Sequence, residues 1–201
     1  MATAHAGVKS HSKTITVYDF DGLSDQVRKK LIEEVRSDRH WAAYHNLSER
    51  LTKDLLPKLL KRHSLSGFCS MHGEGNIVAR CYAGAGGVDL EGTVYWWPRE
   101  GEKGFKLWIV RKIDLEIIGA DCSAYKTPSD NMRMRVRGGP EGLDFDGKME
   151  EEFARVYSDI CGELSERARE IYRSETSDEA LTGLLRGKKR MYLADGSEIG
   201  G

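Results

Sequence analysis

The spacing of apolar residues changes along the chain, and this change constrains the fold more than any other feature of the sequence. Apolar residues recur every three or four positions from about residue 27 to 60 and again from about 148 to 185. Between residues 64 and 137 they alternate with polar residues, and glycines interrupt the runs. The first period is typical of helices and the second of strands. The sequence therefore predicts an α+β fold, with a central antiparallel sheet of about five strands and N-terminal and C-terminal helices packed on one face.

The helices have recognisable start signals. Ser24 is a good N-cap for the first helix, and Ser177 is one for the last. Pro57 lies inside the second helical pattern and predicts a kink or a restart there, because proline lacks the amide hydrogen that its turn needs. The predicted helices begin at about residue 25 and span about residues 48–60, 148–174 and 178–185.

Four segments of the central region have the alternation of strands. In the longest, Phe105, Leu107, Ile109, Ile113, Leu115 and Ile117 share one parity, so we expect them to face the core. Short loops between consecutive strands predict an antiparallel meander. The segments 14–18 and 191–193 are shorter candidates at the two ends of the chain. The central candidates are Ile77–Tyr82, Thr93–Trp97, Lys106–Ile118 and Met132–Arg137.

Length and composition indicate one globular domain. The 201 residues are enough for a single hydrophobic core, and we expect a flexible tail at residues 1–12 followed by one α+β domain over residues 13–201. Basic and acidic residues are nearly balanced, at 31 and 32, and 39% of residues are hydrophobic. This composition excludes a disordered polyelectrolyte and a membrane protein, so we expect no membrane partner and a cytoplasmic location in the host cell.

The cysteines and histidines do not have the spacing of a metal site. Cys69, Cys81, Cys122 and Cys161 contain no C-x-x-C pair, and the six histidines contain no H-E-x-x-H. Structural zinc sites usually need closely spaced ligand pairs. The sequence therefore predicts no metal and no cofactor, and we expect the cysteine thiols to be buried or without a chemical role.

Two carboxylates follow the first predicted strand. Asp19 and Asp21 form a D-x-D pattern like the nucleophile loop of haloacid-dehalogenase-type phosphatases, in which one carboxylate attacks phosphorus. Leu23 stands where that loop has a small hydroxyl residue, and crossover helices do not follow. A strand end leading into a capped helix explains the same residues, and we favour this structural role.

A loop in the central region is a candidate ligand site. Between Ser66 and Gly75 it contains Ser70, His72 and Glu74, the last of which lies between two glycines. A carboxylate between glycines approaches a ligand closely, so this loop could serve a small nucleotide- or metal-dependent enzyme. Turns or bulges are the more common role of glycines between strands.

The most distinctive basic segment is Met132–Arg137. On an extended strand Arg133, Arg135 and Arg137 project to one side about 6.5 to 7 Å apart, while the intervening residues enter the core. This spacing matches successive phosphates of a nucleic-acid strand or a row of carboxylates on a protein. Exposed arginines also serve to prevent edge pairing of sheets.

Two further features bear on partner binding. Lys188, Lys189 and Arg190 form a weaker basic run, since cations after a helix also complement its dipole. Tyr95, Trp96 and Trp97 place large aromatic rings on both faces of one strand. We expect helices to cover them, with an exposed partner anchor as the alternative.

Three separated stretches resemble a family of uncharacterised phage and prophage accessory proteins. Phe20–Asp25 resembles the family's Y-x-F-D-E-L-S opening, with Gly22 in place of the acid. Ser66–Gly75 resembles its central S-G-F-x-S-Q-G-D-G, with one extra residue and Glu74 in place of the aspartate. Ile171–Arg173, Thr176–Ala180 and the later Asp-Gly pair at 195–196 resemble its C-terminal I-Y-R, T-S-D-E-A and D-G sequences.

This resemblance implies a phage or mobile-element accessory protein. Such proteins are often inhibitors, so we expect a non-catalytic inhibitor of a bacterial defence system, like an anti-CRISPR protein, that occludes a binding surface. Its partner would be a bacterial protein or ribonucleoprotein complex, and a homo-oligomer is compatible with the sequence. The alternatives are an enzyme that uses the 66–75 loop and a nucleic-acid-binding protein that uses the 133–137 arginine strand.

Overall fold

The computed structural model describes residues 15–73, 75–82, 87–99, 104–111, 113, 125–126, 131–136 and 145–199, with backbone alone at 39–45 and 125–126. The sequence predicts one domain over residues 13–201 after a tail at 1–12, and that tail lies outside the described residues. The chain divides into two compact units. The sheet unit comprises residues 38–175, and the terminal unit comprises the described residues up to Ser37 and from Thr176 onward. Helix α1 (Asp25–Arg50) contributes residues to both.

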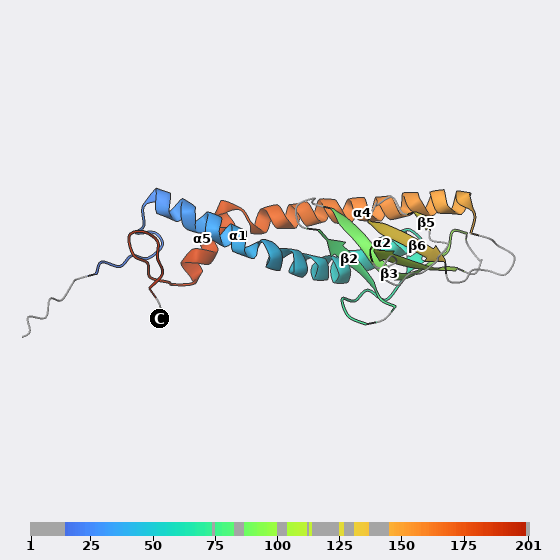
Figure 1. Cartoon of the computed structure of the whole chain (residues 1–201), viewed down its shortest axis with the longest axis horizontal. Coiled ribbons are helices and arrows are strands. Elements are labelled where there is room, and N and C mark those ends of the chain that lie inside the picture. The colour runs from blue at the N-terminus through green and yellow to red at the C-terminus, as the bar shows by residue number, and fades with distance from the viewer. Residues whose placement is uncertain are drawn as a thin grey trace, which may run out of the picture. The chain divides into compact units, whose positions relative to one another are not determined.

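An antiparallel sheet forms the centre of the sheet unit (Figure 1). Its strand order is β1-β3-β4-β6-β5, and β2 pairs with the same edge of β3 as a separate segment. The strands are β1 (Leu65–Ser66), β2 (Ile77–Cys81), β3 (Val88–Trp96), β4 (Phe105–Arg111), β5 (Tyr125–Lys126) and β6 (Met132–Val136). The predicted α+β class with helices around an antiparallel sheet is confirmed.

The order of the strands differs from the predicted meander. β6 lies between β4 and β5, because β4 pairs with β6 and not with the next strand along the chain. β3 begins at Val88, five residues before the predicted start. β4 ends at Arg111, and Ile113 is 58% exposed, so the prediction that Ile113 faces the core is wrong. Leu115 and Ile117 lie outside the described residues.

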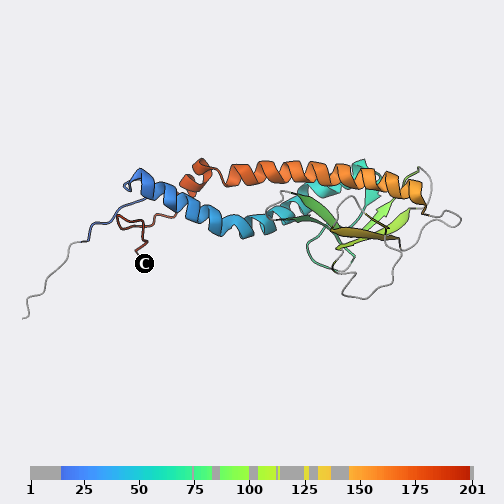
Figure 2. The same ribbon diagram turned by 45° about the horizontal axis from the view of Figure 1, so that its top comes forward.

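Helices cover one face of the sheet, which we call the inner face. Helix α4 (Gly147–Glu175) runs along this face and packs against β2 and β3 (Figure 2). Trp96 of β3 meets Phe153 of α4 edge to face, with ring centroids 5.4 Å apart. Other buried residues of the inner face are Val88, Leu90, Val94, Phe105, Leu107, Ile109, Met132 and Met134.

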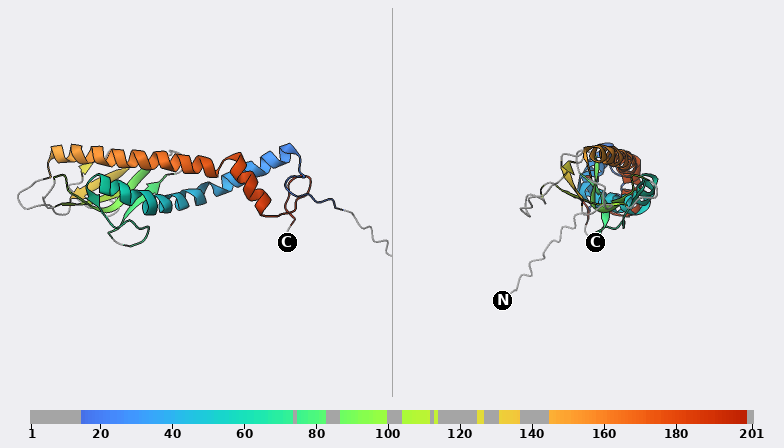
Figure 3. Two further views of the ribbon diagram at one scale, coloured as in Figure 1. Left: turned by 180° about the vertical axis from the view of Figure 1, so that it is seen from behind. Right: turned by 90° about the vertical axis from the view of Figure 1, so that its right-hand side faces the viewer.

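The helical segment before the sheet changes geometry at the predicted proline. Helix α1 continues into a π-helix, η1 (Leu51–Leu55), and then into α2 (Leu56–Arg62), where Pro57 occupies the first turn. Proline lacks the amide hydrogen that a regular turn would use, and the wider turn of η1, in which the Leu56 amide donates to the Leu51 carbonyl, lies directly before Pro57. The predicted kink or restart at Pro57 thus corresponds to a change of helix type without a break, and α2 packs beside α4 (Figure 3).

Two buried hydroxyl groups cover the edge of β2 that faces away from β3. Thr52 of η1 accepts a hydrogen bond from the Ala79 amide at 2.9 Å, and Ser48 of α1 accepts one from the Cys81 amide at 3.0 Å. Thr52 is fully buried and Ser48 is 5% exposed. An uncovered strand edge presents unpaired amides that can pair with another chain. The helix therefore terminates the sheet at β2 with side chains in place of a further strand.

Gly92 marks the point where β3 changes partner. Along one edge of β3, β2 pairs up to Gly92 and β1 pairs from Tyr95, while β4 pairs with the other edge from Gly92 onward. Its φ is +124°, and a Cβ atom there would lie 1.7 Å from the carbonyl oxygen of Asn76. The same oxygen accepts a hydrogen bond from the Thr93 amide at 3.1 Å. No other residue type fits this close backbone approach.

The terminal unit has a small core of its own. Residues from the start of α1, from α5 (Asp178–Gly187) and from the segment after α5 form it. Ser177 caps α5 as predicted, accepting a hydrogen bond from the Ala180 amide at 3.2 Å. The predicted strands at 14–18 and 191–193 are wrong as continuous strands: among their described residues, Tyr18 and Tyr192 form an isolated antiparallel bridge. The buried residues are Phe20, Leu23, Leu31, Ile32, Leu181, Leu185 and Tyr192.

Replacing Gly92 with alanine should destabilise the sheet unit by about 3 kcal/mol or more, because the added methyl group overlaps the Asn76 carbonyl and the φ is unfavourable. Urea denaturation measures the loss. The matched control is Gly162→Ala in α4, where a Cβ atom meets nothing within 4 Å and the change should stabilise the protein by about 0.5–1 kcal/mol. Equal stability of the two variants would contradict this account of the β3 partner change.

Replacing Thr52 with valine keeps the shape of the side chain and removes the acceptor for the Ala79 amide. We expect a loss of about 1–3 kcal/mol, because a buried amide then has no partner. Faster hydrogen exchange at Ala79 should accompany it. Ser158→Ala, at an exposed position of α4, is the control and should leave both quantities unchanged. Unaltered exchange at Ala79 in Thr52→Val would show that the hydroxyl does not protect the edge.

Candidate functional site

The face of the sheet opposite the helices carries aromatic and basic side chains. Alternation places Tyr95 of β3 and Trp108 of β4 on this side, because their neighbours along each strand are buried in the core. At β1 the alternation puts Leu65 and Gly67 toward the core, where a Cβ atom on Gly67 would meet the Ile77 side chain at 2.8 Å. We define the outer face by Ser66, Phe68, Thr93, Tyr95, Trp97, Lys106, Trp108, Arg133 and Arg135.

The strand register arranges these side chains in rows across the sheet. Ser66 of β1 lies opposite Tyr95, which lies opposite Lys106 of β4. In the next row, Thr93 lies opposite Trp108, which lies opposite Arg135 of β6. The two rows are two residues apart along each strand, or about 6.5–7 Å.

Cations and rings stack on one another along these rows. The Lys106 Nζ atom lies 5.8 Å from the centroid of the Tyr95 ring, and the Arg135 guanidinium lies 5.5 Å from the centroid of the Trp108 ring. Both distances are in the range of cation–π attraction. The Tyr95 and Trp97 rings are stacked, with centroids 6.2 Å apart and an interplanar angle of 28°. Five side chains of the outer face are therefore in ring or cation–ring contact with one another.

The predicted arginine row is partly described. Arg133 and Arg135 lie on the outer face and are half-buried, while Met132 and Met134, which alternate with them along the strand, are fully buried. Arg133 Nη1 donates a hydrogen bond to the Met132 carbonyl at 2.7 Å. Arg137 lies outside the described residues. The alternation of arginine and methionine along β6 thus has the geometry that the sequence predicts.

The aromatic residues of β3 divide between the two faces. Trp96 is 1% exposed, as expected of a ring covered by helices, but Tyr95 is 40% exposed, so the expectation that helices cover it is wrong. Sequence reasoning overlooked Phe68, which is 72% exposed, and the pairing of Trp108 with Arg135. The parity of Trp108, opposite to that of the predicted core residues of the same strand, is the signal that would have found it.

The 66–75 loop brings together only part of its candidate residues. The Ser70 hydroxyl accepts a hydrogen bond from the His72 amide at 3.3 Å and donates one to the His72 carbonyl at 3.1 Å. Ser66 is separate from this turn and belongs to β1. Gly73 and Gly75 have φ values of +113° and +76°, which supports the turn role of the glycines. Glu74 lies outside the described residues.

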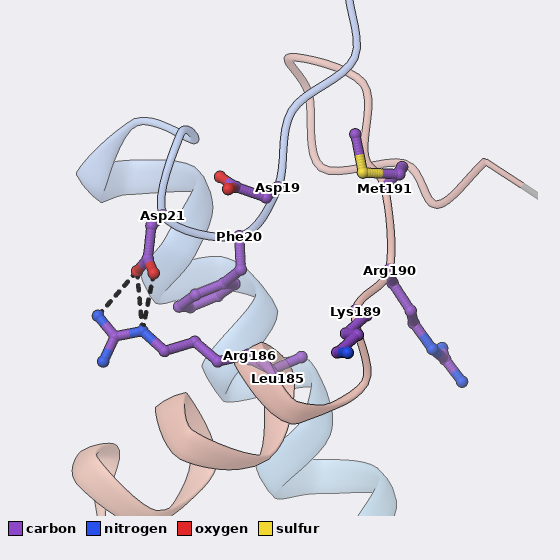
Figure 4. Close-up of a pocket in the computed structure, with 8 residues that line it drawn as sticks. All are labelled: Asp19, Phe20, Asp21, Leu185, Arg186, Lys189, Arg190 and Met191. Atoms are coloured by element: carbon purple, nitrogen blue, oxygen red, sulfur yellow. Dashed lines mark hydrogen bonds and ion pairs between the residues drawn. The ribbon is translucent and has the colours of Figure 1, made fainter.

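The second basic run lies beside a pocket of the terminal unit (Figure 4). The pocket encloses about 290 Å³ over buried Phe20 and Leu185. Lys189 and Arg190 line it, and Arg190 forms an ion pair with Glu198. Lys188 is the C-cap residue of α5, so its charge lies at the negative end of the helix dipole.

The two carboxylates of the D-x-D pattern have structural partners. Asp19 accepts a hydrogen bond from the Gly22 amide at 2.8 Å and so closes the turn before α1. Asp21 accepts three hydrogen bonds from Arg186 at 2.7–3.0 Å, drawn as dashed lines in Figure 4. These bonds hold the pKa of the Asp21 carboxyl below its usual value. The geometry favours the structural role of this pattern over a phosphatase loop.

The three described cysteines lie in environments that disfavour the thiolate. Burial raises the pKa of the Cys69 thiol to about 11 and that of the Cys161 thiol to about 12. Burial also raises the pKa of Cys81. Since the thiolate is the nucleophile, these thiols are poorly reactive at neutral pH. Cys122 lies outside the described residues.

Comparison with protein-family models, with curated proteins and with solved structures finds no match. In the part of the chain that the structure describes, no group of three or more His, Cys, Asp or Glu residues is arranged to hold a metal ion. None of the described helices is long and apolar enough to cross a membrane.

The thiol environment predicts a pH dependence that is measurable residue by residue. In the folded protein, alkylation of Cys69 should keep rising with pH up to about 11, because the thiolate forms only there. In urea the same rise should end near the ordinary pKa of about 8.5. Mass spectrometry of the alkylated peptides separates the individual cysteines. Equal profiles in the folded and unfolded protein would show that burial does not control this thiol.

Proposed function

We propose that this protein is a non-catalytic inhibitor of a bacterial defence system that binds a ribonucleoprotein complex in the host cytoplasm and occludes a surface of it. The outer face is its contact surface. The single observation that carries this proposal is the set of aromatic rings and cations on adjacent strands of that face.

The composition of the outer face supports a binding role. Tyr, Trp and Arg are the residue types most enriched among side chains that dominate binding energy. On the outer face Arg135 stacks on Trp108, and Tyr95 stacks on Trp97. Phe68, at 72% exposed, and Tyr95, at 40%, are large apolar side chains that a partner would remove from water. Their burial in a complex is favourable in proportion to the apolar area covered.

The rigidity of the outer face also supports binding. Its side chains stand on a hydrogen-bonded sheet, and stacking holds Arg135 on Trp108 and Lys106 on Tyr95. Fixing a flexible Lys or Arg side chain on binding costs about 0.5–1.5 kcal/mol, and contact with a ring in the unbound protein lowers this cost for Lys106 and Arg135.

Charge supports a partner that contains nucleic acid. On the outer face, strands β4 and β6 carry Lys106, Arg133 and Arg135, and neither strand contains an acidic residue. A surface of one sign attracts a partner of the opposite sign and raises the rate of encounter. The inhibitory role and the bacterial target follow from the resemblance to phage accessory proteins.

The enzyme alternative has weaker support. The described hydrogen bonds between Ser70 and His72 close a turn. Asp19 closes the turn before α1, and Asp21 forms an ion pair with Arg186. Buried thiols of raised pKa do not favour nucleophilic catalysis. These observations favour binding over turnover.

Expression of the protein in bacterial strains that each carry one ribonucleoprotein-based defence system tests the proposal. We expect phage plating to recover in at least one strain, and the Tyr95→Ala/Arg135→Ala variant to lose at least about tenfold of this recovery, because truncation of central interface residues typically costs more than 1 kcal/mol.

Lys58→Ala/Lys61→Ala removes two exposed cations of α2 and is the matched control, which should plate like the unchanged protein. Circular dichroism and the Tm of each variant establish that the fold is retained. Recovery in none of the strains would contradict the inhibitory function. Full recovery with the folded outer-face variant would show that the outer face is not the contact surface.

A further inference from the structure

We infer that the outer face binds an extended single strand of nucleic acid. This inference rests on the proposed function, because the strand would be the exposed RNA or DNA of the ribonucleoprotein target. It adds the chemical class of the ligand and the part that each row of side chains has in binding it.

The charges on the two halves of the sheet favour a polyanion at β4 and β6. Near the start of β3, Glu91 offsets Arg80 through an ion pair at 2.7 Å. Strands β4 and β6 carry Lys106, Arg133 and Arg135 at outer-face positions, and the sequence of neither strand contains an acidic residue. Phosphates that contact such cations release condensed counterions, which favours binding. A polyanion therefore fits the β4 and β6 side of the outer face best.

The aromatic rings favour bases that are accessible for stacking. Single-strand-binding proteins combine a basic surface with aromatic side chains on which successive bases stack. Here Trp108 of β4 lies opposite Arg135 of β6, and Tyr95 of the neighbouring strand β3 stacks on Trp97, the residue after that strand. A base in contact with Trp108 places its backbone within reach of Arg135, since strands are about 4.8 Å apart.

The spacing along β6 fits consecutive nucleotides. Arg133 and Arg135 are two residues apart on one side of a strand, or about 6.5–7 Å, which is close to the separation of phosphates in an extended strand. The rings of the outer face could not stack on the bases of a duplex, because those bases are already stacked inside it. An acidic protein surface would use the cations, but it would not stack on the rings.

Fluorescence anisotropy with labelled oligouridine and oligothymidine, and with a duplex of the same length, tests this inference on the full chain. We expect binding of one or both single strands, at least about tenfold tighter than binding of the duplex. Trp108→Ala should weaken binding by about tenfold without changing its salt dependence, because stacking releases no counterions. Trp108→Phe should retain most of the affinity.

The two arginines should determine how strongly the affinity depends on salt concentration. In Arg133→Ala/Arg135→Ala, the slope of log affinity against log salt should fall by about 1.4, which corresponds to about 0.7 for each lost phosphate contact on a single strand. The Lys58→Ala/Lys61→Ala control should change neither the affinity nor the slope. This pattern separates a stacking role from a charge role, and a merely structural defect would move both quantities in every variant.

Three outcomes would overturn the inference. The first is no binding of either single strand at high micromolar protein, and the second is equal affinity for single strand and duplex. The third is stronger binding of a polyglutamate peptide, which would indicate an acidic protein surface. If plating depends on the outer face and oligonucleotides do not bind, the proposed function stands and this inference fails. If oligonucleotides bind and plating never recovers, the inhibitory function fails and this inference stands.

Discussion

Strand β3 pairs with three other strands, and the close backbone approach at Gly92 allows it to do so. Its first half pairs with β2 and its second half with β1 and β4. A side chain at Gly92 would occupy the space of the Asn76 carbonyl, which bonds the next residue of β3. Because β1, β2 and β4 pair with β3 directly, and β6 and β5 follow from β4 in turn, the register set here decides which residues face the helices and which face away.

The division between the two faces determines the chemistry of the protein. The alternation that buries Val94 and Trp96 under α4 turns Tyr95 and Trp97 to the outer face. The same alternation on β6 buries methionines and places arginines beside Trp108. A strongly packed inner face fixes the backbone, and the backbone in turn fixes the rows of the outer face. The binding that we propose at the outer face would therefore depend on residues that no partner touches.

Local patterns in the sequence predicted the helices and the faces of the strands, but not which strands pair. The Arg133 and Met134 alternation is a local signal and was correct, whereas the insertion of β6 between β4 and β5 depends on contacts far apart in the sequence. The early start of β3 was missed because Asp89, Glu91 and Gly92 are poor strand formers; an ion pair from Glu91 to β2 and the partner change at Gly92 accommodate them. The sequence alone gives no reason to place the 66–75 loop near the central strands. The sheet register shows that Ser66 lies in the row that contains Tyr95 and Lys106.

The most direct test of ligand binding at the outer face uses the tryptophans of the two faces as internal probes. Trp108 and Trp97 lie on the outer face, and Trp96 is buried on the inner face of the same sheet. In an NMR titration with oligouridine or oligothymidine, the indole signals of Trp97 and Trp108 should shift in proportion to the bound fraction, while that of Trp96 should stay in place. Unchanged signals of Trp97 and Trp108, or a shift confined to Trp96, would contradict the assignment of the outer face as the binding surface.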